Sequence, residues 1–395
     1  MSIHIKDYNS CCGCTACVSI CKHGAISMLS DNLGFLYPQV NNSLCVECGL
    51  CETVCQFHDN YKRYENYSKP IAYSLRLKDN LQLMRSQSGG AFYGIAKYIL
   101  SIGGVIYGAS FNEQWKVVHQ RASNLEELEK LRMSKYVQSD LRGVFQKINN
   151  DLRHGFIVLF TGTACQVAGL KAYIPIKLHK TLFCVDIICH GVPSPQIWED
   201  YILYLESHYQ SKIVKACFRD KRFGWYGAKE TFSFKNSKEI VRQTFNRLYF
   251  SGLSIRESCS NCKFTNINRV GDLTIGDHWG ISKKSPFVKD AKGVSILLVN
   301  SDKGNQILHF INSNFIAELV DINECMQPQL RYPTKLSVLH ENFVNDYCTK
   351  GFYYVAKKYG DIGWKFYIRK FINNFKMSIC RIIWALHIKK KPQRL

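Results

Sequence analysis

The chain has 395 residues and a mass of 45.5 kDa, which is more than one hydrophobic core usually holds, so we expect two or three domains. Hydrophobic residues make up 46% and charged residues 21%, a balance that excludes a wholly disordered or low-complexity chain. The net charge of +21 favours acidic proteins, phosphorylated cofactors or anionic lipid as partners. No apolar run approaches the roughly 20 residues that span a bilayer, and residues 1–10 lack a secretory signal, so we expect a cytoplasmic protein.

Cysteines dominate the N-terminal segment. Half of the 18 cysteines lie within the first 55 residues. A reducing cytosol argues against a framework of disulfides, so metal ligation is the better explanation. The spacing Cys-x2-Cys-x2-Cys-x3-Cys occurs twice, first at Cys11, Cys14, Cys17 and Cys21 and again at Cys45, Cys48, Cys51 and Cys55.

This repeated spacing predicts two 4Fe-4S clusters. Three closely spaced thiolates can hold one cluster, while the fourth cysteine, which we expect to open a helical turn, reaches across to the other. We therefore assign one cluster to Cys11, Cys14, Cys17 and Cys55, and the other to Cys45, Cys48, Cys51 and Cys21. Zinc also binds thiolates, but its sites normally use cysteine pairs separated by a longer loop. Residues 1–60 resemble the bacterial two-cluster ferredoxins, except that Lys22 and Gln56 replace proline, and the extra Cys12 is expected to be an uninvolved thiol.

A glycine-rich helix entry follows a linker predicted at residues 56–70. Residues 86–91, Ser-Gln-Ser-Gly-Gly-Ala, lead into an apolar pattern at 92–100 that predicts a helix, and residues 103–108 predict a turn and a short strand. Backbone amides at such a helix entry can hold a phosphate. The alternative is a glycine-rich start needed only for close packing.

Two further predicted strands each end near a cysteine. Residues 155–160 predict a strand that turns through Cys165 into a helical segment at 167–173, and residues 182–188 predict a strand that ends at Cys189, with Cys184 expected only to pack within it. Open α/β sheets build their sites at the carboxyl ends of strands. Together with Cys259 and Cys262, Cys165 and Cys189 predict a third metal site, on which structural zinc is the competitor of a cluster.

Six motifs in this region resemble the coenzyme F420 hydrogenase/dehydrogenase beta-subunit family. They are residues 86–91, 131–139, 162–169, 189–195, 218–225 and 271–280. The resemblance implies an FAD-binding α/β domain with its own 4Fe-4S cluster on Cys165, Cys189, Cys259 and Cys262, although Ala164 replaces the family's usual proline. The predicted fold class is therefore a multidomain α+β and α/β protein. Its parts are a ferredoxin-like dicluster domain (1–60), the two parts of a flavin-binding domain (70–155 and 156–330) and a helical tail (331–395).

The same resemblance implies a set of flavin-site residues. They are Ser86, Gln87, Ser88, Gly89 and Gly90, with Ser134, Lys135, Tyr136 and Gln138 facing them. Lys135 could hold the pyrophosphate of FAD or stabilise a reduced, anionic ring, or it could be an exposed surface charge. The charged run at residues 219–221, beside Trp225, could flank the substrate, but a charge triplet of this kind is more often a solvated turn. His190 and His278 are either proton donors or structural histidines.

The C-terminal tail is strongly basic. Residues 361–395 carry one acidic and nine basic side chains. On a helix, one face would be apolar and would consist of Trp364, Ile368, Phe371, Phe375, Ile379, Ile382 and Leu386. Such a helix either lies at an anionic membrane surface or packs back on the protein. Nucleic acid is a poorer candidate, because no recognition motif accompanies the charge.

These features predict an iron–sulfur flavoprotein oxidoreductase, with FAD linking one-electron clusters to a two-electron organic acceptor or a deazaflavin. The expected partners are an acidic electron carrier such as ferredoxin, or a partner oxidoreductase subunit, and a small-molecule acceptor. The first alternative is an electron-transfer subunit with no substrate of its own. The second is a structural zinc protein.

Overall fold

The computed structural model describes residues 10–59, 61, 66–281, 285, 287, 290, 292–363 and 368. The helix predicted at residues 364–386 of the basic tail therefore lies almost entirely outside the described residues. The structure does not address either expectation for it, contact with a membrane or packing on the protein. Within the described part of the chain, no helix combines the length and the hydropathy needed to cross a bilayer.

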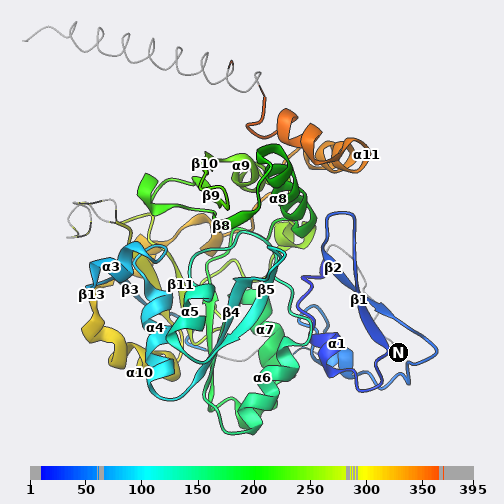
Figure 1. The fold of residues 1–395 in the computed structure, drawn as a ribbon. Helices are drawn as coiled ribbons and strands as arrows, with labels where there is room; N and C mark the ends of the chain where they lie inside the picture. The colour runs from blue at the N-terminus through cyan, green and yellow to red at the C-terminus, as the bar shows by residue number, and fades with distance from the viewer. Residues whose placement is uncertain are drawn as a thin grey trace, which may run out of the picture.

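The N-terminal unit is small and holds both cysteine repeats. Its elements are α1 (Ala16–Ile20), β1 (Ile26–Ser30), β2 (Leu36–Val40) and α2 (Leu50–Thr53). The strands β1 and β2 form an antiparallel hairpin, and α1 packs against α2 and against the helix α7 (Ala164–Tyr173) of the main body. Figure 1 shows the hairpin at the right-hand side of the molecule, with α1 between it and α7.

The main body is built on an eight-stranded mixed sheet with the order β13-β3-β12-β11-β7-β6-β4-β5. The neighbours β11, β7, β6 and β4 run parallel, and the outer pairs run antiparallel. Its strands are β3 (Ile71–Leu77), β4 (Val105–Phe111), β5 (Val117–Ala122), β6 (Val158–Thr163), β7 (Leu182–Ile187), β11 (Leu273–Asp277), β12 (Ser295–Val299) and β13 (Phe315–Val320).

Helices cover both faces of this sheet, which explains why its central strands are mainly apolar. One face carries α3 (Asn80–Met84), α4 (Ala91–Ser101), α5 (Leu125–Leu131) and α10 (Asp302–Ile311). The other face carries α6 (Val144–Arg153) and α7 (Ala164–Tyr173). A mixed α/β multidomain protein with an N-terminal ferredoxin-like unit is therefore confirmed, and residues from both 70–155 and 156–330 share one sheet.

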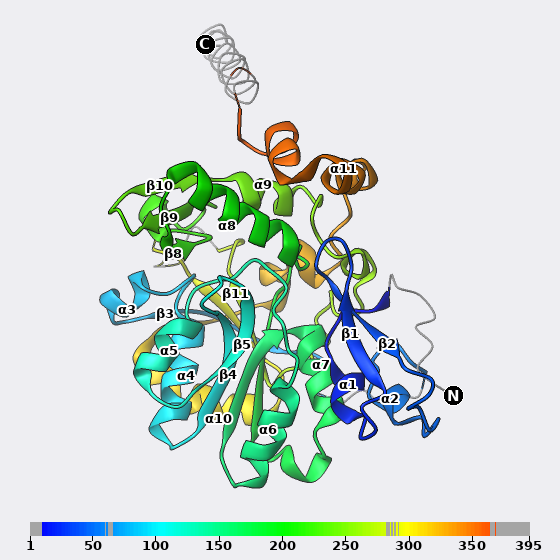
Figure 2. The same cartoon turned by 45° about the vertical axis from the view of Figure 1, so that its right-hand side comes forward.

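A second lobe lies above the carboxyl ends of the parallel strands (Figure 2). It contains a three-stranded antiparallel sheet and three helices around an aromatic core. Its elements are α8 (Pro195–Tyr209), β8 (Ile213–Cys217), β9 (Glu230–Phe234), β10 (Glu239–Arg242), α9 (Thr244–Phe250) and α11 (His340–Lys358). The helix α11 contacts α8 and α9, so the described part of the predicted tail segment 331–395 belongs to this lobe.

Candidate redox centres and the adjoining cavity

The two cysteine repeats share an unusual backbone. Gly13 and Thr15 flank Cys14 with positive φ angles of 66° each, and Glu47 and Gly49 flank Cys48 with φ angles of 53° and 72°. Residues in the left-handed conformation on both sides of the second cysteine turn the backbone tightly. In each repeat one of these two residues, Thr15 or Glu47, is not glycine and has a side chain that disfavours this conformation. The repeated geometry therefore gives both repeats the same loop shape around their thiols.

Each predicted N-terminal set is brought together. Cys21, Cys45, Cys48 and Cys51 line one small cavity. In the other set, burial raises the pKa of the Cys17 thiol, and the nearby Cys14, Cys11 and Cys55 raise it further. The structure thus groups the thiols of Cys11, Cys14, Cys17 and Cys55, and the fourth cysteine of each repeat lies with the other repeat.

The local helices differ from the prediction that the fourth cysteine opens a helical turn. The helix α1 begins at Ala16 and ends before Cys21, and α2 begins at Leu50 and ends before Cys55. Each helix therefore contains the third cysteine, and the fourth follows its end. This position lets the chain leave the helix in the direction of the opposite repeat.

The four main-body cysteines also meet. Cys165, at the start of α7, and Cys189, just after β7, line one cavity with Cys259 and Cys262. They converge because β6 and β7 are parallel neighbours in register, Thr163 opposite Ile187, so both strands deliver a cysteine to the same edge. The mid-strand Cys184 is 1% exposed and packs in the core beneath α6 and α7, as predicted for it.

The donor sets fit iron–sulfur clusters. Each set consists of four thiols, the ligands that 4Fe-4S clusters take, and backbone amides donate to two of the sulfurs, from Gly13 to Cys11 (3.4 Å) and from Gly191 to Cys189 (3.3 Å). In the described part of the chain, no three His, Cys, Asp or Glu side chains converge as ligands of a single metal ion.

A cavity of about 500 Å³ lies between the carboxyl edge of the sheet and the second lobe. This volume is typical of small-molecule and cofactor sites. Thr163, Gln166, Cys189, Gly191, Val192 and Gln329 line both this large cavity and the cavity of the third cysteine set. The two cavities therefore share a wall, and Cys189 belongs to it.

Most of the residues that the sequence predicted for a flavin site line this large cavity. They are Ser86, Gln87, Ser88, Gly90, Ser134, Lys135 and Tyr136. Gly89 lies behind the surface, where an added Cβ would be 2.1 Å from the carbonyl oxygen of Leu75. Gln138 faces the third cysteine set instead, donating to the backbone oxygen of Cys12 at 2.8 Å.

The charged run at 219–221 shapes the glycine-rich loop, so the expectation of a solvated turn is wrong. Arg219, Asp220 and Lys221 are each less than 10% exposed. The Lys221 ammonium donates to the backbone oxygens of Leu83 (2.8 Å) and Ser88 (2.7 Å), and the Gln87 amide donates to the oxygen of Arg219 (2.6 Å). This bonding holds the loop before α4 in place.

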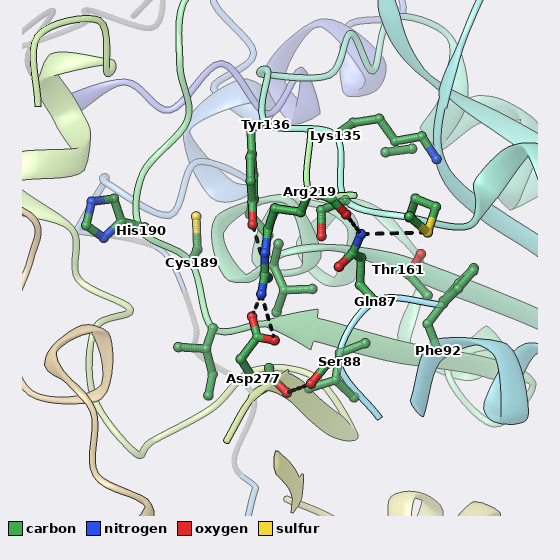
Figure 3. Close-up of a pocket in the computed structure, with 18 of the residues that line it drawn as sticks. Gln87, Ser88, Phe92, Lys135, Tyr136, Thr161, Cys189, His190, Arg219 and Asp277 are labelled. Carbon is green, nitrogen blue, oxygen red and sulfur yellow. Dashed lines mark hydrogen bonds and ion pairs between the residues drawn. The ribbon is translucent and has the colours of Figure 1, made fainter. Parts of the chain in front are cut away.

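Arg219 itself lies at the centre of the cavity wall (Figure 3). It forms an ion pair with Asp277 at 2.7 Å and donates to the Tyr136 hydroxyl at 3.3 Å. The indole of Trp225 donates to the same Asp277 carboxylate at 2.7 Å. The positive charge next to the cavity is therefore balanced by a carboxylate, and the pair is held rigidly. Arg219 and Asp277 lie within the recognised motifs, but a charge run alone gave no sign of their burial.

Three cavity-lining side chains have buried nitrogen atoms without a partner among the described residues. They are His119 (Nδ1), Arg132 (Nε) and His190 (Nε2). Burial lowers the pKa of His119 to about 4, and its Nε2 lies 2.9 Å from the oxygen of Thr161. His119 was missed because a single histidine in an alternating strand carries no motif. Unsatisfied buried polar atoms in a cavity wall fit a polar ligand.

The two candidate histidines differ in position. His190 lines the cavity, and the Gln329 amide lies 2.8 Å from its Nδ1. Because that amide donates, Nδ1 accepts and Nε2 carries the proton of the neutral ring, whose pKa burial lowers. His278 contacts the Ser74 hydroxyl at 2.7 Å and does not line this cavity.

Comparison with known families agrees with this geometry. Residues 10–58 match the model of the 4Fe-4S dicluster domain, and residues 157–324 match the model of the C-terminal part of the coenzyme F420 hydrogenase/dehydrogenase beta subunit. With its dicluster domain, the chain is an iron–sulfur protein related to electron-transfer oxidoreductases.

Two individual proteins are similar to it. The coenzyme F420-dependent sulfite reductase of Methanocaldococcus jannaschii is 24% identical over 384 residues, covering 91% of this chain and 54% of that protein. The chain thus spans about half the length of this relative. A chain of the F420-reducing [NiFe] hydrogenase complex from Methanosarcina barkeri is 18% identical, with a TM-score of 0.44 over 66% of this chain and 86% of that one.

Proposed function

We propose that this protein is an iron–sulfur flavoenzyme with three 4Fe-4S clusters and one FAD, exchanging electrons between a one-electron donor and an organic two-electron partner. The observation that carries the proposal is the wall shared by the large cavity and the third cysteine set, which includes Cys189. FAD bound in the cavity would supply the conversion between one-electron and two-electron chemistry. The third cysteine set in turn lies next to the first, through Cys12 and Cys14.

The protein's own residues have separate roles in this proposal. The first turn of α4 would present backbone amides to a phosphate group, whereas the amides of Ser86, Gly89 and Gly90 in the loop before it are already bonded within the protein. Lys135 adds a positive charge when protonated. His190 holds a proton on Nε2 in the cavity wall, where it would donate a hydrogen bond to an electron-rich atom of a bound substrate.

An organic deazaflavin is the first substrate class to examine, since the relative from Methanocaldococcus jannaschii is named for its use of coenzyme F420. Ferredoxin is the proposed one-electron partner, because the chain is basic and such carriers are acidic.

The decisive test is composition. Chain purified without oxygen should contain about twelve irons with matching sulfide, from three cubane clusters, and one FAD. Zinc in place of four irons would assign the third site to zinc, and a colourless protein without iron or flavin would refute the proposal. The Lys221→Met variant should lose FAD and keep its iron, since Lys221 holds the flavin loop but contacts no cluster cysteine.

A second candidate is an electron-transfer subunit without a substrate of its own. The observation that favours it is the family itself, whose model is named for a beta subunit. Turnover of a small acceptor by the purified chain with reduced ferredoxin supports the enzyme. Rapid reduction of FAD with no turnover until a partner oxidoreductase is added supports the subunit.

A further inference from the structure

Two residues outside the three cysteine sets meet between the first set and the third. Cys12 is 9% exposed and Gln56 is 5% exposed. The Gln56 amide nitrogen donates to the Cys12 sulfur at 2.9 Å and to the backbone oxygen of Cys165 at 2.9 Å. The sequence analysis placed Gln56 at the start of a linker and Cys12 outside the ligand sets, and the structure shows both side chains buried and in contact with each other.

The position of Cys12 is defined by contacts with both sets. Its sulfur lies close to the thiols of Cys14 in the first set and Cys165 in the third, and it lines the same cavity as Cys165. The two sets approach closely because α7, which begins beside Cys165, carries Gly169 against Cys14, and a Cβ there would lie 2.8 Å from the Cys14 sulfur. Cys12 therefore fills the space between two ligand sulfurs.

The side-chain amide of Gln56 points its nitrogen, and not its oxygen, toward the Cys12 sulfur. Its oxygen is buried without a partner among the described residues, while its nitrogen makes both hydrogen bonds. A buried unpaired acceptor costs about 1–3 kcal/mol. The Cys12 sulfur accepts from Gln56, so its single S–H proton remains available to one of the two neighbouring ligand sulfurs.

We propose that Cys12, held by Gln56, donates its thiol hydrogen bond to the ligand sulfurs of Cys14 and Cys165 and thereby raises the reduction potentials of the first and third clusters. Hydrogen bonds to cluster sulfurs are among the factors that set these potentials, and they favour the reduced, more negative form. The S–H group of Cys12 would donate to whichever ligand sulfur, of Cys14 or Cys165, is more negative. The hydrogen bond would therefore form with the cluster that holds the electron. The inference rests on the proposed function, since it requires both clusters.

The test is a potentiometric titration of the full-length protein, followed by paramagnetic resonance. Cys12→Ala should lower the potentials of the first and third clusters. A tenfold fall in the ratio of reduced to oxidised cluster at a fixed potential corresponds to about 59 mV for one electron. The cluster on Cys21, Cys45, Cys48 and Cys51 should not change and serves as the internal reference.

Three further variants complete the design. Cys12→Ser keeps an O–H donor and should restore most of the shift, and Gln56→Leu should lower the same two potentials by a smaller amount. Cys325→Ala removes another buried free cysteine, one that lines neither of the two cysteine-lined cavities, and should leave all the potentials unchanged.

Unchanged potentials in Cys12→Ala with full iron content would overturn the inference. Loss of about four irons from this variant would also overturn it, because Cys12 would then be a ligand. These outcomes differ from failure of the proposed function, in which the unmodified protein itself lacks the clusters.

Discussion

The ammonium group of Lys135 donates to the backbone oxygen of Lys130 at 3.0 Å and to that of Arg132, in the wall of the large cavity. Burial lowers the pKa of Lys135 to about 7, and the nearby Cys217 opposes the shift. The sequence left two interpretations of Lys135 open. Its desolvation and its hydrogen bonds fit a cation beside the proposed flavin better than a free surface charge.

Lys135 therefore predicts a pH dependence of FAD binding. Below pH 7 the ammonium is charged and attracts the pyrophosphate, and above pH 7 this attraction is lost. Lys135→Gln should weaken FAD binding about tenfold at pH 6, or about 1.4 kcal/mol, and much less at pH 8.5. Titration of apoprotein with FAD at both pH values measures the effect.

The matched control is Lys130→Gln, which removes an exposed lysine on α5 and should leave FAD binding unchanged at both pH values. Equal weakening of Lys135→Gln at pH 6 and pH 8.5 would contradict the assignment.

At the scale of elements, the second lobe contains a buried carboxyl group with a raised pKa. Glu230, the first residue of β9, is 0% exposed, and it accepts from the Tyr201 hydroxyl at 3.0 Å and from the backbone nitrogen of Asn246. Burial raises the pKa of Glu230 from 4.5 to about 8. Between about pH 4.5 and about pH 8, the folded protein therefore retains a proton on Glu230 that the unfolded chain has lost.

The free energy of unfolding should therefore fall as pH rises from about 4.5 to about 8, by up to about 1.4 kcal/mol per pH unit from this group. Glu230→Gln removes the ionisable carboxyl, so its stability relative to the unmodified protein should increase by roughly 2–4 kcal/mol between pH 5 and pH 8. Thermal unfolding under anaerobic conditions at the two pH values measures this difference. Glu113→Gln, in the exposed turn after β4, is the control, and a pH-independent effect of Glu230→Gln would refute the explanation.

The elements also show what the sequence could predict. Apolar runs located β6 and β7 within three residues, and the apolar pattern at 92–100 located α4 within one residue at each end. Cysteine spacing anticipated which N-terminal thiols gather. The burial of residues 219–221 could not be anticipated, because it depends on carbonyl oxygens from α3 and from the loop before α4, far away in the sequence. His119 and the role of Gln56 depend in the same way on contacts between distant segments.

At the scale of the whole molecule, the three cysteine sets and the cavity form a continuous series. The third set connects the N-terminal unit to the cavity, because Cys12 and Cys189 line the same space. Removing the proposed third cluster should therefore separate the dicluster unit from the proposed flavin without removing either.

Cys259→Ser tests this arrangement. The variant should lose about four of twelve irons and keep FAD. Reduction of its flavin by reduced ferredoxin should slow at least tenfold, while reduction by a direct hydride donor should stay within a factor of about two. Stopped-flow absorbance measures both rates, with Cys348→Ser, an exposed cysteine on α11, as the control. Equal loss of both reactions would contradict the series.

Arg256 attaches the N-terminal unit to the main body. Its guanidinium is 0% exposed and donates to the backbone oxygens of Cys11 (2.7 Å) and Leu36 (2.9 Å) and to Gln138 (3.0 Å), and it lies 4.1 Å from the ring centre of Tyr37. A cation fixed by so many buried partners leaves no freedom for swinging between docked and undocked positions. Solvent viscosity should consequently have no influence on the proposed internal charge transfer, which would proceed in a stationary frame and not by a shuttling carrier.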